Sequence, residues 1–191
     1  MKALRLLCCL LFSFLAAEPG KGFDGLIKDD SKNDEFEVLL APNAGGISCF
    51  HNPSLFYVIL RNKTEKPKRL FEFWNSWGYQ NISFYFYMPD GNHVVTRKDQ
   101  DFTRNFPSTY EVPGGETIVF PITFDKSWLE LPNISEGESK VKMQVVYICN
   151  PSFDAKRANA WTGIVASKVY EVTFWRAHAS TLNLQAEQSA P

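Results

Sequence analysis

The sequence predicts an all-β fold: an antiparallel sandwich of two sheets with seven or eight strands. Apolar side chains recur at every second residue through most of the central chain, which is the period of a strand with one inward face. Turn sequences such as Pro-Asp-Gly-Asn at residues 89–92 separate these runs at short spacing. No stretch carries the 3.6-residue apolar repeat of an ordinary helix. Short strands at this spacing, over about 140 residues, are typical of a two-sheet sandwich.

Each run of alternating apolar residues defines one expected strand. In chain order, the expected strands cover residues 35–41, 55–62, 69–74, 81–88, 93–98, 116–124, 140–149 and 163–175. The run Ile-Ser-Phe-Tyr-Phe-Tyr-Met over residues 82–88 shows the alternation most clearly. Pro121 lacks a backbone N–H, so its strand is expected at a sheet edge or a bulge. A bulge is also expected around Ser167 in the last strand.

The first 17 residues have the layout of a cleavable secretory signal peptide. Lys2 and Arg5 precede an apolar run over residues 6–17, which gives way to Glu-Pro-Gly at residues 18–20. This run is too short to cross a hydrocarbon core, which needs about 20 helical residues. We therefore expect residues 1–17 to be a signal peptide and the protein to be secreted or periplasmic, without a membrane span.

Behind the signal peptide we expect three segments. Residues 18–34 form a polar lead-in, residues 35–176 form the β-sandwich domain, and residues 177–191 form a flexible tail rich in Ala, Ser and Gln. Loss of Lys2 and Arg5 with the signal peptide changes the formal net charge from −1 to −3. A mildly acidic domain of this kind disfavours nucleic acid as a partner.

Two cysteines, Cys49 and Cys149, remain once the signal peptide is removed. Cysteines of exported chains commonly pair, and closing a loop of about 100 residues would restrict the unfolded chain strongly. The alternative is two separately buried thiols. The sequence pattern leaves both interpretations open.

Several motifs resemble one known family. Residues 55–67 form a strand that ends at an Asn before a charged turn with Pro, and residues 113–116 are Pro-Gly-Gly-Glu. A Tyr-ending strand at residues 145–147 is followed by Trp-x-Gly-x-Val-x-Ser over residues 161–167. Over about residues 35–175, the chain resembles the immunoglobulin-like β-sandwich domains of secreted, mostly uncharacterised bacterial proteins. The resemblance implies a strand order that places the two cysteines near opposite poles, but it implies no activity.

The sequence contains few residues in patterns typical of catalytic or metal-binding sites. Cys49 and His51 lie two residues apart, so both side chains would point to the same side of a strand, and His93 follows a hairpin turn. A metal site needs three or four convergent ligands, with paired spacings that the sequence lacks. The sequence therefore predicts no enzyme, no cofactor and no metal. The alternative is an exported enzyme or metal-handling protein that uses Cys49, His51 and His93.

Aromatic residues make up 15% of the chain and concentrate between residues 71 and 79. Trp74, Trp77 and Tyr79 lie near an expected connection between strands, and Trp77 and Tyr79 fall in turn chemistry rather than on a core face. Exposed aromatic rings beside polar groups stack on sugars or anchor a protein partner. These three residues are therefore the candidate binding site. The alternative is that the aromatic rings cover an open end of the sandwich.

Three Asn-x-Ser/Thr sequons begin at Asn62, Asn81 and Asn133. Each lies at an expected strand end or loop, where a glycan is sterically plausible. All three are candidate glycosylation sites in a eukaryotic secretory pathway. A bacterial source, which the family resemblance favours, would leave them unmodified.

The sequence as a whole favours a secreted, non-catalytic β-sandwich module that binds a protein or a glycan through its loops or an exposed strand edge. Some proteinase inhibitors share this strand pattern and fall within the same hypothesis. A purely structural role in an envelope or matrix is not separated from it by the sequence. The identity of the protein or glycan partner is left open.

Overall fold

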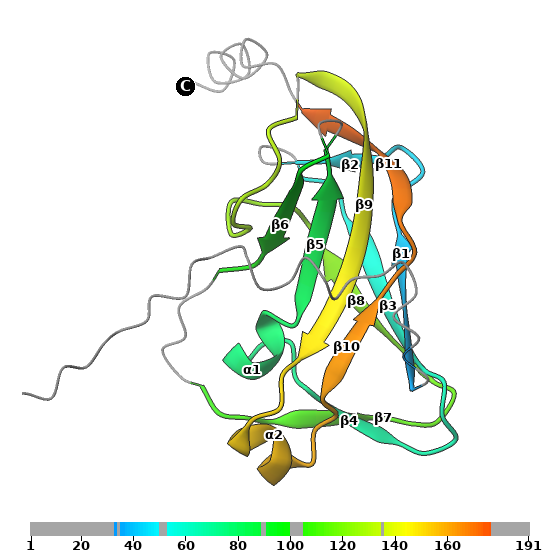
Figure 1. Cartoon of the computed structure of the whole chain (residues 1–191), viewed down its shortest axis with the longest axis vertical. Coiled ribbons are helices and arrows are strands. Elements are labelled where there is room, and N and C mark those ends of the chain that lie inside the picture. Colours follow the sequence, from blue (N-terminus) through cyan, green and yellow to red (C-terminus); the bar gives the residue numbers. More distant parts are fainter. Residues whose placement is uncertain are drawn as a thin grey trace, which may run out of the picture.

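The computed structural model describes residues 33, 35–49, 53–88, 91–99, 105–134 and 136–176. The predicted signal peptide, the predicted tail and His51 lie outside the described residues, as does nearly all of the predicted lead-in. Across the described residues the fold is all-β, with eleven strands and two short helices. Two sheets pack against each other as a sandwich, as the sequence predicts (Figure 1).

Three strands form the smaller sheet, in the order β1-β3-β8. Their bounds are Phe36–Ala41 (β1), Phe56–Asn62 (β3) and Thr117–Ile122 (β8). Among the described residues, β8 pairs with a neighbour on one side only, and Pro121 lies opposite Tyr57 in the β3–β8 ladder. Because proline has no N–H to donate to a further strand, this edge position confirms the prediction for Pro121.

The larger sheet has the order β2-β11-β9-β5-β6, and β10 also pairs with β9. The bounds are Ile47–Ser48 (β2), Ile82–Tyr87 (β5), His93–Arg97 (β6), Gly137–Cys149 (β9), Gly163–Ala166 (β10) and Tyr170–Arg176 (β11). All its pairings are antiparallel except that of β2 with β11. The strand order of the two sheets is that of a β-sandwich.

A separate two-stranded ribbon of β4 (Lys68–Phe71) and β7 (Thr109–Val112) lies near one end of the sandwich (Figure 1). The two helices, α1 (Ser76–Tyr79) and α2 (Phe153–Ala158), lie toward the same end. Neither these helices nor any other described segment forms a helix long and apolar enough to cross a membrane.

The core lies between the two sheets and is built from the inward residues of each strand. On β3 these are Phe56, Val58 and Leu60, all 0% exposed. Phe84 of the larger sheet packs against Phe56, with 5.7 Å between ring centres. Phe124 contacts both rings, at 4.9 Å from Phe56 and 5.0 Å from Phe84. Much of the aromatic content therefore fills the core.

The last predicted strand is divided by the expected bulge. β10 ends opposite Val146 and β11 begins opposite Met143, so the outer strand has one residue more than the matching stretch of β9. Ser167 lies at this break, and its Oγ accepts a hydrogen bond from the backbone N of Val145 at 3.1 Å. The serine hydroxyl thus satisfies a donor that the interrupted ladder would leave unpaired.

The structure departs from the predicted elements in its shortest segments. The strand expected at residues 69–74 ends at Phe71, and the chain then turns into α1. The apolar pattern also misses β2, β7 and α2. β2 has two residues, β7 has four and α2 covers fewer than two helical turns, so any apolar period in them is too brief to stand out from the surrounding chain.

Candidate functional site

The connection between β4 and β5 carries the predicted binding residues and is held by one buried amide. Asn75, 0% exposed, caps α1 because its Oδ1 accepts from the backbone N of Trp77 and of Gly78, at 3.1 and 3.0 Å. Its Nδ2 donates to the carbonyl of Ser108 at 3.0 Å. Gly78 lies so close to the end of β4 that a Cβ there would sit 2.3 Å from the carbonyl oxygen of Glu72. The connection is therefore fixed against the β4–β7 ribbon.

The structure separates the three predicted binding residues. Trp74 is 47% exposed. Trp77 is half-buried, and its Nε1 donates to Oδ2 of Asp154 at 2.9 Å, which ties α1 to α2. Tyr79 is buried against Phe73, with 5.7 Å between ring centres. The three rings do not make one exposed surface, and Trp77 instead helps to cover an end of the sandwich.

Trp74 and Tyr79 nevertheless share a cleft of about 550 Å³ that is open to solvent. Its walls come from the segments that follow β4 and β6, from the end of α1 and from β7. The lining residues are Glu72, Phe73, Trp74, Tyr79, Lys98 and Tyr110. Four aromatic rings therefore share one cleft with one carboxylate and one ammonium group.

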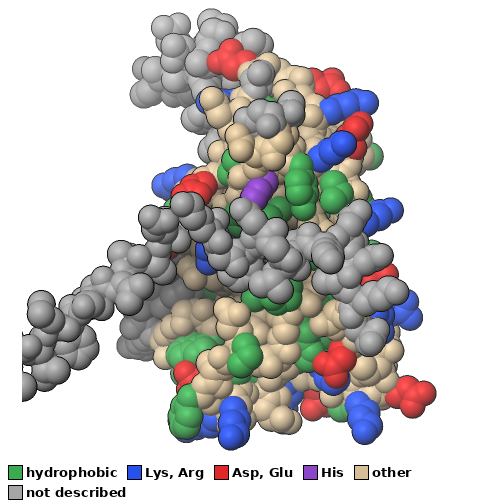
Figure 2. All heavy atoms as spheres, viewed as in Figure 1, with side chains coloured by type: hydrophobic (Ala, Val, Ile, Leu, Met, Phe, Trp, Pro, Cys, Tyr) green, Lys and Arg blue, Asp and Glu red, His purple; other side chains and the backbone are tan. Residues whose placement is uncertain are grey.

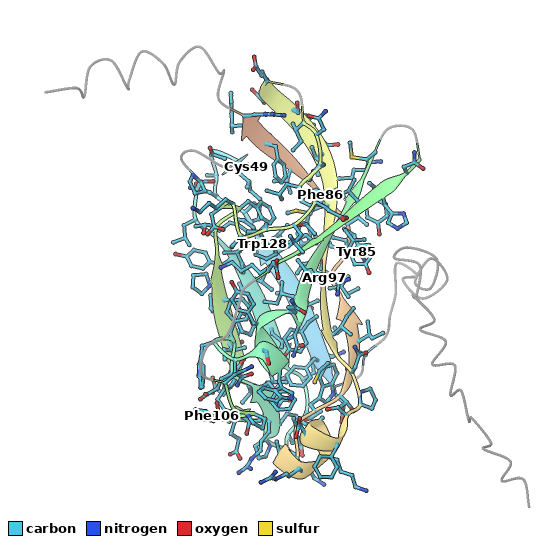
Figure 3. The ribbon with its side chains drawn as sticks, turned by 90° about the vertical axis from the view of Figure 1, so that its left-hand side faces the viewer. Cys49, Tyr85, Phe86, Arg97, Phe106 and Trp128 are labelled. Atoms are coloured by element: carbon cyan, nitrogen blue, oxygen red, sulfur yellow. The ribbon has the colours of Figure 1, made fainter. Side chains whose placement is uncertain are left out.

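The carboxylate of Glu72 is held by two donors. Its Oε2 accepts from Nε1 of Trp74 at 2.6 Å and from the hydroxyl of Ser108. Among the described residues no donor reaches Oε1, which stays available to a ligand. Trp74 in turn packs edge-to-face against Phe106, with 5.0 Å between ring centres, near one end of the molecule (Figure 3). Both the carboxylate and the indole therefore have defined orientations in the free protein.

Lys98 places a cation beside aromatic rings. Its Nζ lies 5.3 Å from the centre of the Tyr79 ring and 6.0 Å from that of Trp128, within the range of cation–π contacts. Its backbone follows β6 and forms a bridge with Trp128. No carboxylate of the described residues lies within ion-pair distance of this ammonium group. The two rings hold the charge without neutralising it.

Tyr110 supplies a hydroxyl without a partner. Its Oη is buried and makes no hydrogen bond to the described part of the chain. Burial raises the pKa of this phenol well above its usual value, and the charges of Tyr147 and Glu72 act in the same direction. The hydroxyl therefore stays neutral at physiological pH, where it can both donate and accept. A buried hydroxyl without a partner is uncommon in a folded protein, and this one belongs to a residue that lines the cleft.

No known protein family and no curated protein matches this sequence. The function of the cleft is therefore interpreted from its own chemistry.

Four residues of the cleft are absent from the predicted binding site: Glu72, Phe73, Lys98 and Tyr110. Glu72 stands inside the aromatic segment 71–79 but carries no signal of its own. Lys98 ends an expected strand, whereas Tyr110 belongs to β7, which was not predicted. The alternation Thr-Tyr-Glu-Val before the Pro-Gly-Gly turn is the one signal that would have indicated a strand there.

The charges on the face of the larger sheet are mixed. In the space-filling view of this face, acidic and basic side chains lie interspersed over the described surface, without a broad area of one sign (Figure 2). Binding of nucleic acid generally uses a continuous basic patch or stripe. This face does not present one.

The two cysteines are free, buried and far apart. The backbone N of Cys49 donates to the carbonyl of Trp175 at 3.4 Å, and Trp175 pairs with Glu138 near the start of β9. Cys149 ends β9, and the stretch from Glu138 to Cys149 is roughly 35 Å long at about 3.3 Å per residue. A disulfide spans only about 4.4–6.8 Å between Cα atoms. The pairing that the sequence left open is therefore absent within the chain, and the thiols are buried separately.

The catalytic alternative lacks a shared geometry. Cys49 follows β2 and His93 begins β6, so β11, β9 and β5 lie between them in the larger sheet. Ligands of one metal ion lie within a few ångströms of each other, so Cys49 and His93 do not share a metal site in this fold. His51 lies outside the described residues. Within those residues, no three His, Cys, Asp or Glu side chains are arranged to hold a metal.

Both thiols are also protonated at neutral pH and therefore weakly reactive. Burial raises the pKa of Cys49 to about 12 and that of Cys149 to about 11. Thiolate, not thiol, is the nucleophile and the metal ligand. At neutral pH neither cysteine presents the reactive form that the alternative requires.

In two of the three sequons the asparagine side chain is buried and makes hydrogen bonds within the fold. Asn62 is 0% exposed, and its Nδ2 donates to carbonyls of the neighbouring turns. Asn81 is 9% exposed and its Nδ2 donates to Oη of Tyr147 at 3.3 Å. A glycan needs an exposed asparagine amide, and the buried amides of Asn62 and Asn81 do not offer one in this fold. Asn133 is exposed, with Oδ1 accepting from Nη1 of Arg176 at 3.0 Å, and stays a candidate.

Proposed function

We propose that this protein is a secreted binding module that takes a glycan in the cleft beside Trp74. The observation that carries the proposal is the combination of an aromatic wall with three different polar groups in one open cleft. Sugar rings have apolar C–H faces that pack on aromatic rings and hydroxyl edges that need donors and acceptors. Glu72, Lys98 and Tyr110 offer both kinds of partner.

The size of the cleft favours a small ligand. Clefts that bind small molecules typically measure about 300–1,000 Å³, and this cleft has about 550 Å³. A stable protein partner generally buries about 800 Å² on each side. The second candidate, a protein partner, is supported by the exposed pair of Trp74 and Phe106, which are 47% and 59% exposed and form a ready aromatic anchor.

The proposal also includes export of the protein after cleavage of a signal peptide. The charged start, apolar run and Glu-Pro-Gly exit of residues 1–20 support a cleaved signal peptide, and the sandwich supports kinship with immunoglobulin-like domains of secreted bacterial proteins. Sequencing the N-terminus of the protein recovered outside the cytoplasm tests the first point. A mature chain that begins near Glu18 is the expected result, and an intact Met1 in that fraction would contradict it.

Binding is tested with the full chain on a panel of immobilised neutral, acidic and basic oligosaccharides, followed by calorimetric titration of the strongest ligand. Trp74→Ala is expected to weaken binding about tenfold, because one stacked aromatic ring contributes about 0.5–1.5 kcal/mol in addition to the free energy of the apolar area that it buries. Unchanged thermal unfolding would show that the loss is local.

Phe153→Ala is the matched control for this test. Phe153 is 79% exposed at the start of α2 and does not line the cleft. Its removal is expected to leave the affinity unchanged. Absence of any oligosaccharide ligand, or equal losses in the Trp74 and Phe153 variants, would contradict glycan binding in this cleft.

A further inference from the structure

The cleft has an uneven charge balance, which bears on the kind of sugar it accepts. Glu72 contributes a negative charge whose Oε2 already accepts two hydrogen bonds, from Trp74 and Ser108. Lys98 contributes a positive charge whose neighbours are the rings of Tyr79 and Trp128, with no carboxylate at ion-pair distance in the described chain. Among the described residues, the charge in the cleft that lacks a strong partner is therefore the positive one.

A carboxylate outside the cleft, that of Asp125, does not remove this imbalance. The charge of Lys98 acts on the carboxyl group of Asp125. Burial raises the pKa of this carboxyl, but the hydrogen bonds from Ser127 and the charge of Lys98 together outweigh burial, so the pKa lies below its usual value. Its Oδ1 accepts from both the backbone N and the hydroxyl of Ser127. Asp125 is not within ion-pair distance of Lys98 and does not line the cleft.

A partly buried ammonium group is more stable with a counter-charge than without one. We infer that the sugar bound in this cleft carries an anionic substituent, a carboxylate or a sulfate ester, which pairs with Nζ of Lys98. This inference rests on the proposed glycan binding and adds the ligand class. Oε1 of Glu72 then accepts from a sugar hydroxyl, and Oη of Tyr110 donates to a ligand oxygen.

A cationic sugar fits this arrangement less well. An amino sugar would bring a second ammonium group toward Lys98, whose charge already occupies the face of Tyr79. A neutral sugar would satisfy Glu72 and Tyr110 but would leave Lys98 without a counter-charge. The three ligand types therefore have a predicted order of affinity, with the anionic sugar first.

The test compares three probes by calorimetric titration of the full chain at low ionic strength: a trisaccharide of galacturonic acid, the same trisaccharide with its carboxylates reduced to alcohols, and a sulfated galactose trisaccharide. We expect an anionic probe to bind about tenfold to a hundredfold more tightly than the reduced probe, the range given by one charged hydrogen bond. The two anionic probes distinguish carboxylate from sulfate.

Lys98→Gln is expected to remove this preference, and Lys98→Arg is expected to keep it, because arginine retains the charge. Lys140→Gln removes the same charge from an exposed ion pair with Glu171 on the sheet surface and should leave the preference intact. A preference that persists in Lys98→Gln, or that disappears equally in Lys140→Gln, would overturn the inference.

The two proposals fail in different ways. Equal binding of charged and reduced probes, lost in Trp74→Ala, would overturn the anionic ligand and leave glycan binding in the cleft intact. A failure of both anionic trisaccharides to bind at millimolar concentration would also overturn the anionic ligand. A failure of every oligosaccharide in the wider panel would overturn both proposals.

Discussion

Asn62 shows how a single buried side chain joins distant parts of this fold. Its Nδ2 donates to the carbonyls of Lys66, Val112 and Pro113, at 2.8, 3.0 and 3.1 Å. Its Oδ1 accepts from the backbone N of Thr64 at 3.0 Å. The amide therefore connects the turn after β3 to the end of β7, the strand that carries Tyr110 into the cleft. A sequon that looks like a modification site is a structural crosslink between two turns.

Replacing Asn62 with Ala is expected to lower the free energy of unfolding by about 3 kcal/mol. The variant removes three hydrogen bonds to backbone carbonyls and leaves the backbone N of Thr64 without its acceptor, although the carbonyls of Lys66 and Pro113 keep second donors in Thr64 and Glu116. Each buried group that loses its partner costs about 1–3 kcal/mol. Urea unfolding followed by tryptophan fluorescence measures the change. Asn133→Ala, at an exposed position, is the control and is expected to stay within about 0.5 kcal/mol of the wild type. Equal stability of the two variants would show that the Asn62 contacts contribute little.

At the scale of elements, the sequence indicates most clearly the strands that bury one whole face. β3 and β5 each carry an unbroken apolar series, so their existence follows from the residue pattern alone. The helix α1 exists for other reasons: Asn75 caps it, and Gly78 allows it to approach β4. Neither signal is periodic, which explains why the sandwich was predictable and this helix was not.

The candidate site is predictable only in part for the same reason. Trp74 and Tyr79 stand out because they belong to a dense aromatic segment. Lys98 and Tyr110 reach the cleft because the pairing of β4 with β7, and the course of the chain after β6, bring them beside Glu72. Such long-range convergence depends on strand pairing, which the local residue pattern does not specify.

Gly78→Ala is expected to disturb both the α1 element and the cleft. The new Cβ would lie 2.3 Å from the carbonyl oxygen of Glu72 and 2.7 Å from that of Phe71, and backbone atoms cannot rotate away. Overpacking of this kind costs about 1–3 kcal/mol. Because Glu72 must shift, glycan affinity should fall together with stability. Unfolding and calorimetric titrations measure the two effects.

Gly45→Ala is the control for this substitution. A Cβ at Gly45 meets no atom within 4 Å, so the added methyl group is expected to leave stability and affinity unchanged. If Gly78→Ala bound the ligand as the wild type does, the close approach of α1 to β4 would not be what positions the cleft wall.

At the scale of the whole molecule, one three-way contact joins both sheets and the ribbon. Glu35, just before β1, forms an ion pair with Lys68 of β4. It also accepts from Nε1 of Trp161 at 2.6 Å, and Trp161 leads into β10. The Trp161 ring packs on Phe36 at 5.0 Å and on Tyr147 at 6.1 Å between centres. The smaller sheet, the larger sheet and the β4–β7 ribbon therefore meet at one carboxylate.

This contact makes the stability of the protein depend on pH in a defined direction. The hydrogen bond from Lys68 is the main cause that lowers the pKa of Glu35; burial opposes it, and Trp161 acts with Lys68. A carboxyl group whose pKa is lower in the folded state than in the unfolded chain stabilises the fold at pH values above its unfolded pKa, which is about 4.3 for glutamate. That contribution is lost as the pH falls through the folded pKa.

Glu35→Gln is therefore expected to be less stable than the wild type at pH 7, and the difference should shrink at pH 3. The effect should stay below about 1 kcal/mol, because the side chain of Glu35 is 44% exposed and solvent screens the pair. Urea unfolding at both pH values measures it. Glu111→Gln, which breaks an exposed ion pair with Arg69 at 3.9 Å, is the matched control and should change little at either pH. A Glu35→Gln difference of the same size at pH 3 and pH 7 would mean that lost packing, rather than the carboxylate charge, joins the sheets at this point.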